Sequence, residues 1–309
     1  MSSQYLDLVY TGRNQWWRYL AGVLLIVGLW FGTAVATYRA LGMLAQMARH
    51  TSDLALRRAI EAIMADPFTE YVAINLGHIA ILLGLILTVC LIHKRRFISL
   101  ITHAHSVRWK RIGWGFAVYF ILAAVLTALD YAVYPSVYRA TAHPFRVLIH
   151  APAVMVLTPL QATAEEMLFR GYLMQGAGLI TRRFWFPAVL TSAIFMTLHL
   201  ANPEVEHGAI AACTYYFGIA FLLAFITIRS NSLELAIGAH AAINLFSALL
   251  VNYSDSALAV ESFFFSTELH LGANLAALGV MAVVSYVFFF TSLRPSSLAA
   301  HASTEVDRV

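Results

Sequence analysis

Charged residues are scarce in this sequence of 309 residues: Lys, Arg, Asp and Glu together make up 12%, whereas 60% of the residues are hydrophobic. A soluble globular domain carries about 25% charged residues. The shortage therefore argues against a soluble protein and predicts a chain that crosses the membrane several times. The formal net charge of +4 does not indicate nucleic-acid binding. The basic residues flank hydrophobic segments, where membrane topology and lipid headgroups account for them.

Cysteine is nearly absent as well, with only Cys90 and Cys213 in separate apolar segments. Two such cysteines form neither a disulfide framework nor a metal-binding spacing. Residues 1–20 lack the short apolar core and the small-residue cleavage site of a signal peptide. The sequence also lacks internal repeats, low-complexity runs and any segment polar enough to form a soluble domain.

Long hydrophobic segments are what the sequence has in abundance. A helix that spans a bilayer needs about 20 mostly apolar residues. Eight segments qualify, namely 17–42, 71–93, 113–135, 146–164 (continuing to 176), 185–201, 208–229, 233–253 and 271–293. The sequence therefore predicts an all-α fold, a polytopic membrane helix bundle with about eight transmembrane helices and the active site inside it. Residues 45–67 mix charged and apolar residues at helical spacing, which predicts an amphipathic helix at or outside the membrane surface.

Basic residues are distributed unequally between the two sides of this predicted bundle. With the N-terminus inside, 13 of the 20 Lys and Arg residues lie on the cytoplasmic side, six of them in the loop 94–111, and 6 lie on the other side. Loops rich in Lys and Arg stay in the cytoplasm. We therefore expect both termini to be cytoplasmic, in an integral protein of a bacterial cytoplasmic (inner) membrane.

Several polar residues interrupt the apolar segments. They are Glu165, Glu166 and Arg170 in the fourth segment, His199 in the fifth, His240 and Asn244 in the seventh, and His78 and His150 elsewhere. Ionisable residues inside a membrane are costly and usually face the protein interior or a water-filled cavity. Glu166 and Arg170 are four residues apart, so on a helix they share a face and can form an ion pair. Glu165 points about 100° away from Glu166, so its compensation must come from another helix.

These residue types suit hydrolysis of an amide. A glutamate and a histidine that share a water molecule can activate it, while His240 and Asn244 can donate hydrogen bonds to a developing oxyanion. No Ser, Cys or Thr is paired with a base in an obvious way, so direct attack by water is favoured and no cofactor is expected. Zinc held by Glu165, His199 and His240 is the alternative. The sequence has no H-E-x-x-H motif, however, and Asn is a poor transition-metal ligand.

Three motifs in order along the chain resemble those of a known family. They are Glu165-Glu166-x-x-x-Arg170, Phe195-x-x-x-His199 and His240-x-x-x-Asn244. The set resembles the CPBP family of CAAX-protease and bacteriocin-processing enzymes, also called Abi, which are intramembrane glutamic endopeptidases. The resemblance covers roughly residues 150–255. It implies that Glu166 and Arg170 organise the site and that Phe195 supports it.

The resemblance also implies roles for the other motif residues. Glu165 would be the general base, and His199 would help to hold and activate the water. His240 and Asn244 would form the oxyanion hole. One departure concerns the substrate: family members that process prenylated proteins carry an acidic residue nine positions after the catalytic glutamate, where this sequence has Met174. A prenylated CAAX-type substrate is therefore not expected.

The motifs divide the chain into three regions. Residues 1–145 form an N-terminal transmembrane region of unassigned role, 146–255 the catalytic core, and 256–309 a C-terminal helix and tail. The expected partners are the lipid bilayer and a membrane-associated or membrane-inserted peptide substrate. Two alternatives stay open, a non-catalytic protein of the same fold that serves bacteriocin immunity or scaffolding, and a zinc-dependent membrane peptidase. A transporter with a proton relay is less favoured, because no internal repeat is visible.

Overall fold

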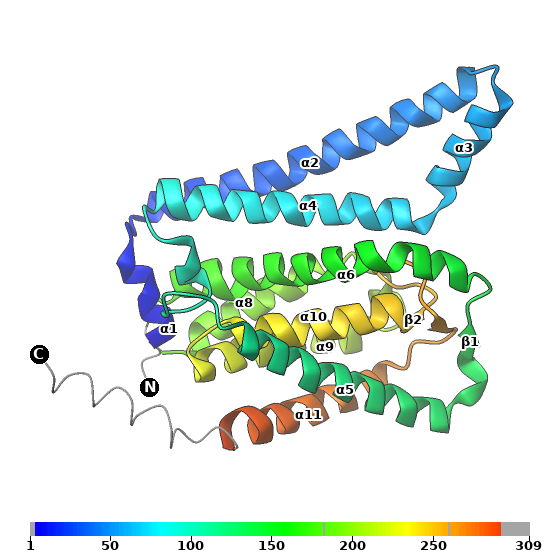
Figure 1. The fold of residues 1–309 in the computed structure, drawn as a ribbon. Coiled ribbons are helices and arrows are strands. Elements are labelled where there is room, and N and C mark those ends of the chain that lie inside the picture. Colours follow the sequence, from blue (N-terminus) through cyan, green and yellow to red (C-terminus); the bar gives the residue numbers. More distant parts are fainter. Residues whose placement is uncertain (1–3, 182, 259, 292–309) are drawn as a thin grey trace, which may run out of the picture.

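Eight apolar helices dominate the structure, a computed structural model that describes residues 4–181, 183–258 and 260–291 (Figure 1). Six of them are long and apolar enough to cross a membrane: Trp16–His50, Pro67–Ile92, Trp109–Val133, Pro144–Ala177, Ala209–Ser230 and Leu271–Phe290. Trp185–Leu198 and Glu234–Leu249 are shorter apolar helices. Each predicted hydrophobic segment contains one of these helices. The predicted all-α, polytopic membrane bundle is confirmed, and the chain is an integral membrane protein.

The elements follow one another with short connections. The α-helices are α1 (Gln4–Asp7), α2 (Trp16–His50), α3 (Leu54–Ala65), α4 (Pro67–Leu87), α5 (Trp109–Val133), α6 (Pro144–Glu166), α7 (Met174–Ala177), α8 (Trp185–Leu198), α9 (Ala209–Ser230), α10 (Glu234–Leu249) and α11 (Leu271–Tyr286). Three π-helical segments continue them: η2 (Thr88–Ile92), η5 (Met167–Leu173) and η7 (Val287–Thr291). The 3-10 helices are η1 (Leu8–Thr11), η3 (Phe97–Leu100), η4 (Pro135–Val137) and η6 (Pro203–Val205).

The amphipathic stretch expected over residues 45–67 is divided between two helices. Its first residues belong to α2, which runs to His50, and α3 covers Leu54–Ala65. Two aspartates set these boundaries, because their side chains accept hydrogen bonds from the free N–H groups of a helix start. Asp53 accepts from the backbone at the start of α3, and Asp66 caps α4 just before a proline. In Figure 1 the far part of α2 and α3 project from the rest of the bundle.

A small sheet, which the sequence analysis did not predict, closes one end of the bundle. Its strands are β1 (Tyr138–Ala140), β2 (Val251–Tyr253) and β3 (Phe264–Ser266), in the order β1-β3-β2. β3 pairs antiparallel with β1 and parallel with β2. Runs of three residues are too short to show an alternating pattern in the sequence. The sheet ties the start of α6 to the segment after α10 (Figure 1).

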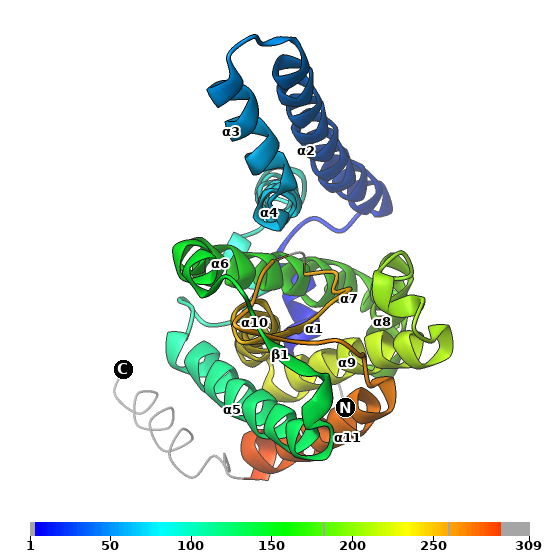
Figure 2. The ribbon, with the colours of Figure 1, turned by 90° about the vertical axis from the view of Figure 1, so that its right-hand side faces the viewer.

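Helix α10 lies at the centre of the bundle, between α5, α6 and α9 (Figure 2). Glycines allow its close approach to α5. A Cβ atom on Gly238 would lie 2.0 Å from the backbone oxygen of Ile112, and one on Gly115 would lie 2.4 Å from that of Leu235. Small residues let helix backbones approach in this way. The contact holds α10, and with it His240 and Asn244, against the rest of the core.

Candidate active site

The two adjacent glutamates lie where α6 changes its helical form. Glu165 and Glu166 end the α-helical part, and η5 continues it as a π-helix. Pro159, one turn and a half earlier, lacks an N–H group, and the hydroxyl of Thr163 donates to its carbonyl at 2.7 Å. Single π-helical turns inside α-helices are frequent at functional sites. The chain thus leaves regular α-helical geometry directly after the two glutamates.

Glu166 and Arg170 form a sealed ion pair. Nη1 of Arg170 lies 2.8 Å from Oε1 of Glu166, and the two side chains are 1% and 0% exposed. Nη2 of Arg170 donates to the backbone oxygen of Ala220 on α9 at 2.9 Å. The guanidinium also lies over the ring of Phe195, 5.0 Å from its centroid. The ion pair predicted from the four-residue spacing is confirmed, and the pair connects α6 to α8 and α9.

His240 on α10 lies between the two glutamates. Its Nδ1 is 2.8 Å from Oε1 of Glu166, and its Nε2 is 3.8 Å from Oε2 of Glu165. An ionised carboxylate only accepts hydrogen bonds, so Nδ1 carries a proton and donates to Glu166. The longer distance is an electrostatic contact and not a hydrogen bond. His240 is thus oriented by Glu166, with its Nε2 turned to the side of Glu165.

Glu165 has different neighbours from Glu166. Nε2 of His78 on α4 lies 3.2 Å from Oε1 of Glu165, and Nε2 of Gln161 donates to the same oxygen at 3.3 Å. The Glu165 side chain is 10% exposed. The compensation that Glu165 needed from another helix comes from His78 and His240.

His78 was not among the predicted site residues. The signal that points to it is a polar stripe on one face of α4, made by Tyr71, Asn75 and His78 at helical spacing. Tyr71 bonds with Thr158 of α6, so the stripe faces α6. The sequence alone shows His78 only as an ionisable residue in an apolar stretch, because nothing in a single sequence shows which helix lies opposite.

His199 caps the C-terminal end of α8 and is half-buried. Its Nδ1 lies 2.7 Å from the backbone oxygen of Phe195, which only accepts, so Nδ1 carries the proton. In the neutral ring Nε2 then holds the lone pair, and no described residue forms a hydrogen bond or ion pair with it. The imidazole stacks on the ring of Phe195 at 4.1 Å and lies 4.8 Å from that of Tyr216. His199 is therefore rigidly held with one ring nitrogen available.

Asn244 lies one turn beyond His240 on α10 and is half-buried. Within the described parts of the chain its amide makes no hydrogen bond to protein. Phe195 connects the remaining motif residues, because its ring contacts His199 and Arg170 and lies 6.4 Å from that of His240. The structure thus brings the three motifs together, with Glu165 and Glu166 in direct contact with His240 and with His199 reached through Phe195.

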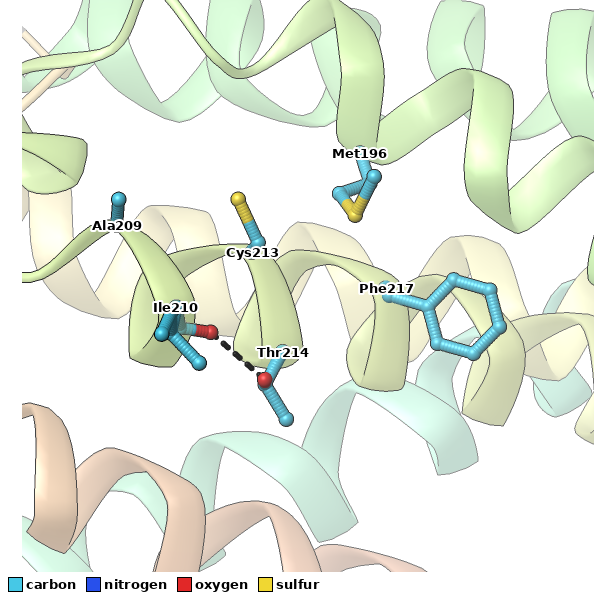
Figure 3. A pocket seen from close by; sticks show the side chains of 6 residues that line it. All are labelled: Met196, Ala209, Ile210, Cys213, Thr214 and Phe217. Carbon is cyan, nitrogen blue, oxygen red and sulfur yellow. Dashed lines mark hydrogen bonds between the residues drawn. The ribbon is translucent and has the colours of Figure 1, made fainter.

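Two further properties bear on what the site can hold. Among the described residues, no three His, Cys, Asp or Glu side chains form a group that could hold a metal ion. An apolar hollow of about 460 Å³ lies between Met196 of α8 and the first turns of α9 (Figure 3). Its lining residues are Met196, Ala209, Ile210, Cys213, Thr214 and Phe217. Met196 and Phe217 directly follow Phe195 and Tyr216, the two rings that flank His199.

Comparisons with known proteins show the family of the chain. Residues 146–246 match the protein-family model described as Type II CAAX prenyl endopeptidase Rce1-like. The chain is 32% identical over 247 residues to the uncharacterized protein YyaK of Bacillus subtilis (strain 168), and this alignment covers 79% of the chain and 81% of YyaK. No solved structure matches the chain. The chain belongs to the Rce1-like family of CAAX-protease-type membrane proteins, and the family resemblance of its motifs is confirmed.

Proposed function

We propose that this protein is an intramembrane endopeptidase in which Glu165 is the general base. The contrast between the two adjacent glutamates carries the proposal. Glu166 is fully buried and paired with Arg170, whereas Glu165, although also buried, keeps a side-chain exposure of 10% and faces histidines from two other helices. A carboxylate that water can reach, next to histidines that orient it, is equipped to accept a proton from that water.

The reaction we propose is direct attack by water on a peptide carbonyl. Glu165 takes a proton from the water while the water oxygen forms a bond to the carbonyl carbon, and the carbonyl electrons move onto its oxygen. The lone pair on Nε2 of His199 accepts a hydrogen bond from the same water and orients it. The carbon–nitrogen bond then breaks, and Glu165 returns the proton to the leaving amine.

The oxyanion of this step needs hydrogen-bond donors. Nε2 of His240, when protonated, and the free amide of Asn244 lie one turn apart on α10 and supply two of them. Donors fixed before the reaction contribute a few kcal/mol each to catalysis. The bond from His240 to Glu166 supports this role, because it keeps Nε2 of the ring turned to the side of Glu165.

The substrate we propose is a membrane-associated or membrane-inserted peptide without a prenyl group. Position 174, where prenyl-processing relatives carry an acidic residue, holds a methionine that is fully buried in the core. A buried thioether makes no charged contact with a substrate. The apolar helices that surround the site support a substrate that arrives from the lipid phase.

Cleavage by purified protein in liposomes tests the proposal. The probes are internally quenched peptides of varied sequence, each prepared with and without a C-terminal farnesyl group. We expect the wild type to cleave some unfarnesylated peptides and Glu165→Gln to cleave none, because an amide cannot take the proton. Glu70→Gln is the matched control, since Glu70 is an exposed glutamate of α4.

Three outcomes would contradict parts of this proposal. Full activity of Glu165→Gln would refute the role of Glu165 as base. Loss of wild-type cleavage with a strong chelator, and its return with zinc, would favour the metal-dependent alternative. The non-catalytic alternative holds if two results occur together. Neither the wild type nor Glu165→Gln cleaves any peptide, and cells with a triple variant at Glu165, His199 and Asn244 keep the wild-type phenotype.

A further inference from the structure

His78 links the N-terminal helices to the candidate active site. It lies on α4, outside the residues 146–246 that match the family. We propose that His78 is a positioning residue that holds one carboxylate oxygen of Glu165, so that the N-terminal transmembrane region completes the active site. The inference rests on the proposed function of Glu165.

The register between α4 and α6 is what brings His78 to Glu165. The two helices run parallel and side by side (Figure 1). The hydroxyls of Tyr71 and Thr158 lie 2.7 Å apart in the buried interface. His78 follows Tyr71 by seven residues, and Glu165 follows Thr158 by seven, which is about two helical turns on each side. Because the helices are parallel, the contact between Tyr71 and Thr158 predicts the contact between His78 and Glu165 two turns further on.

The hydrogen-bond inventory shows that a proton lies between His78 and Glu165. Nδ1 of His78 lies 3.0 Å from the backbone oxygen of Ile74, so Nδ1 donates to that carbonyl. Nε2 of the neutral ring would then be an acceptor, yet it lies 3.2 Å from Oε1 of Glu165. Two acceptors at this distance repel one another unless they share a proton. With Glu165 ionised, as its proposed role as base requires, the proton belongs to Nε2 of His78, and the contact is a charge-assisted hydrogen bond, one of the stronger kinds.

This bond leaves the two oxygens of Glu165 in different situations. Oε1 is held by His78 and also accepts from the amide of Gln161. Oε2 receives no hydrogen bond from the described residues and lies on the side of His240. His78 thus fixes the carboxylate through Oε1 and leaves Oε2 to meet the water. A base held in this way keeps a productive geometry, and small misplacements of such a group are costly.

The test compares two replacements of His78 with a matched histidine. Leucine removes the hydrogen bond, whereas glutamine keeps an N–H group near the position of Nε2. His150→Leu is the control, because His150 lies in the same interface, is 15% exposed compared with 14% for His78, and faces Asp66 at 3.8 Å. We measure kcat and KM per folded enzyme on a quenched peptide that the wild type cleaves and Glu165→Gln does not, together with the melting temperature.

We expect His78→Leu to lower kcat by about ten-fold to a hundred-fold with KM changed less than about three-fold, because a hydrogen bond to a charged group is lost. His78→Gln should recover most of kcat, and His150→Leu should keep the wild-type value. Wild-type kcat in His78→Leu would overturn the inference, as would equal loss in both His78 variants or a loss explained by unfolded protein alone. The inference alone fails if Glu165→Gln is inactive and His78→Leu is active, whereas the absence of any Glu165-dependent cleavage refutes the proposed function itself.

Discussion

At the scale of single residues, the adjacent glutamates differ because of where their helix turns them. Glu166 shares a face with Arg170, and that part could be predicted from a four-residue spacing. Glu165 points elsewhere, and its partners come from α4 and α10. The partner on α4 could not be predicted, since a single sequence contains no record of which helices pack together. The different roles that we propose for the two glutamates thus depend on tertiary contacts.

The buried ion pair of Glu166 and Arg170 leads to a prediction about stability. Glu166→Gln leaves the guanidinium of Arg170 buried without a counter-charge, and removal of one partner of a buried ion pair costs about 3–5 kcal/mol. One oxygen of Glu166 and Nε of Arg170 already lack hydrogen-bond partners among the described residues, so little remains to compensate the loss. We expect a clearly lower melting temperature in detergent for Glu166→Gln than for Glu165→Gln.

The control for this prediction removes both charges. The double variant Glu166→Gln with Arg170→Met should recover part of the lost stability, because no uncompensated charge then stays buried. Equal melting temperatures of the two single glutamate variants would show that the pair does not stabilise the fold. Thermal unfolding followed by intrinsic fluorescence gives the comparison.

At the scale of elements, the helices could be predicted and their neighbours could not. A hydrophobic run of sufficient length is enough to predict a membrane helix, and for that reason each predicted segment contains a helix. The strands of three residues, such as β1 (Tyr138–Ala140), are too short for any pattern. Asp53 and Asp66 are helix caps, and aspartate is a residue type typical of the position directly before a helix start.

The length of α8 also matters for the site. Its 14 residues cover about 21 Å at 1.5 Å per residue, less than the roughly 30 Å of a bilayer core. We therefore expect its C-terminal end, with His199, to lie at membrane depth. The chain then continues through residues 199–208 without a long helix. Irregular backbone at such a depth is tolerated where it lines a water-filled cavity, which agrees with the hydrolysis that we propose for this site.

The contact between α5 and α10 makes a prediction at the scale of elements. Gly238→Ala places a methyl group against the backbone of α5, with its Cβ 2.0 Å from an oxygen that cannot rotate away. Overpacking costs about 1–3 kcal/mol in ordinary cores, and backbone contact places this variant at the upper end or beyond. We expect loss of stability, and loss of cleavage with it, because α10 carries His240.

The matched control is Gly113→Ala on α5, where an added Cβ meets nothing within 4 Å. In a helix, alanine is also favoured over glycine by about 1 kcal/mol. Gly113→Ala should therefore keep or raise the melting temperature. If Gly238→Ala is as stable and as active as Gly113→Ala, the close approach of α5 and α10 is not required.

At the scale of the whole molecule, the orientation in the membrane is predicted from basic residues. Some of these residues also form ion pairs and hydrogen bonds inside the protein. Three of those in the loop 94–111 are tied to the protein itself. Nη2 of Arg95 donates to Gln175, while Arg108 and Arg111 lie 2.9 and 3.5 Å from an oxygen of Glu234. Their number in the loop therefore reflects internal packing as well as topology. The predicted orientation needs a direct test.

Two exposed serines at opposite ends of the bundle provide that test. Ser52 lies between α2 and α3, and Ser106 lies in the loop before α5. With both termini cytoplasmic, α2 crosses outward and α4 returns. Ser52 then faces the outside and Ser106 the cytoplasm.

We replace each serine by cysteine in a background in which Cys90 and Cys213 are alanine, and treat cells with a membrane-impermeant maleimide. Ser52→Cys should react in intact cells, and Ser106→Cys only after permeabilisation. The reverse labelling pattern would show the opposite orientation in the membrane. The end of the bundle that carries the sheet, where α6 begins, would then face the cytoplasm.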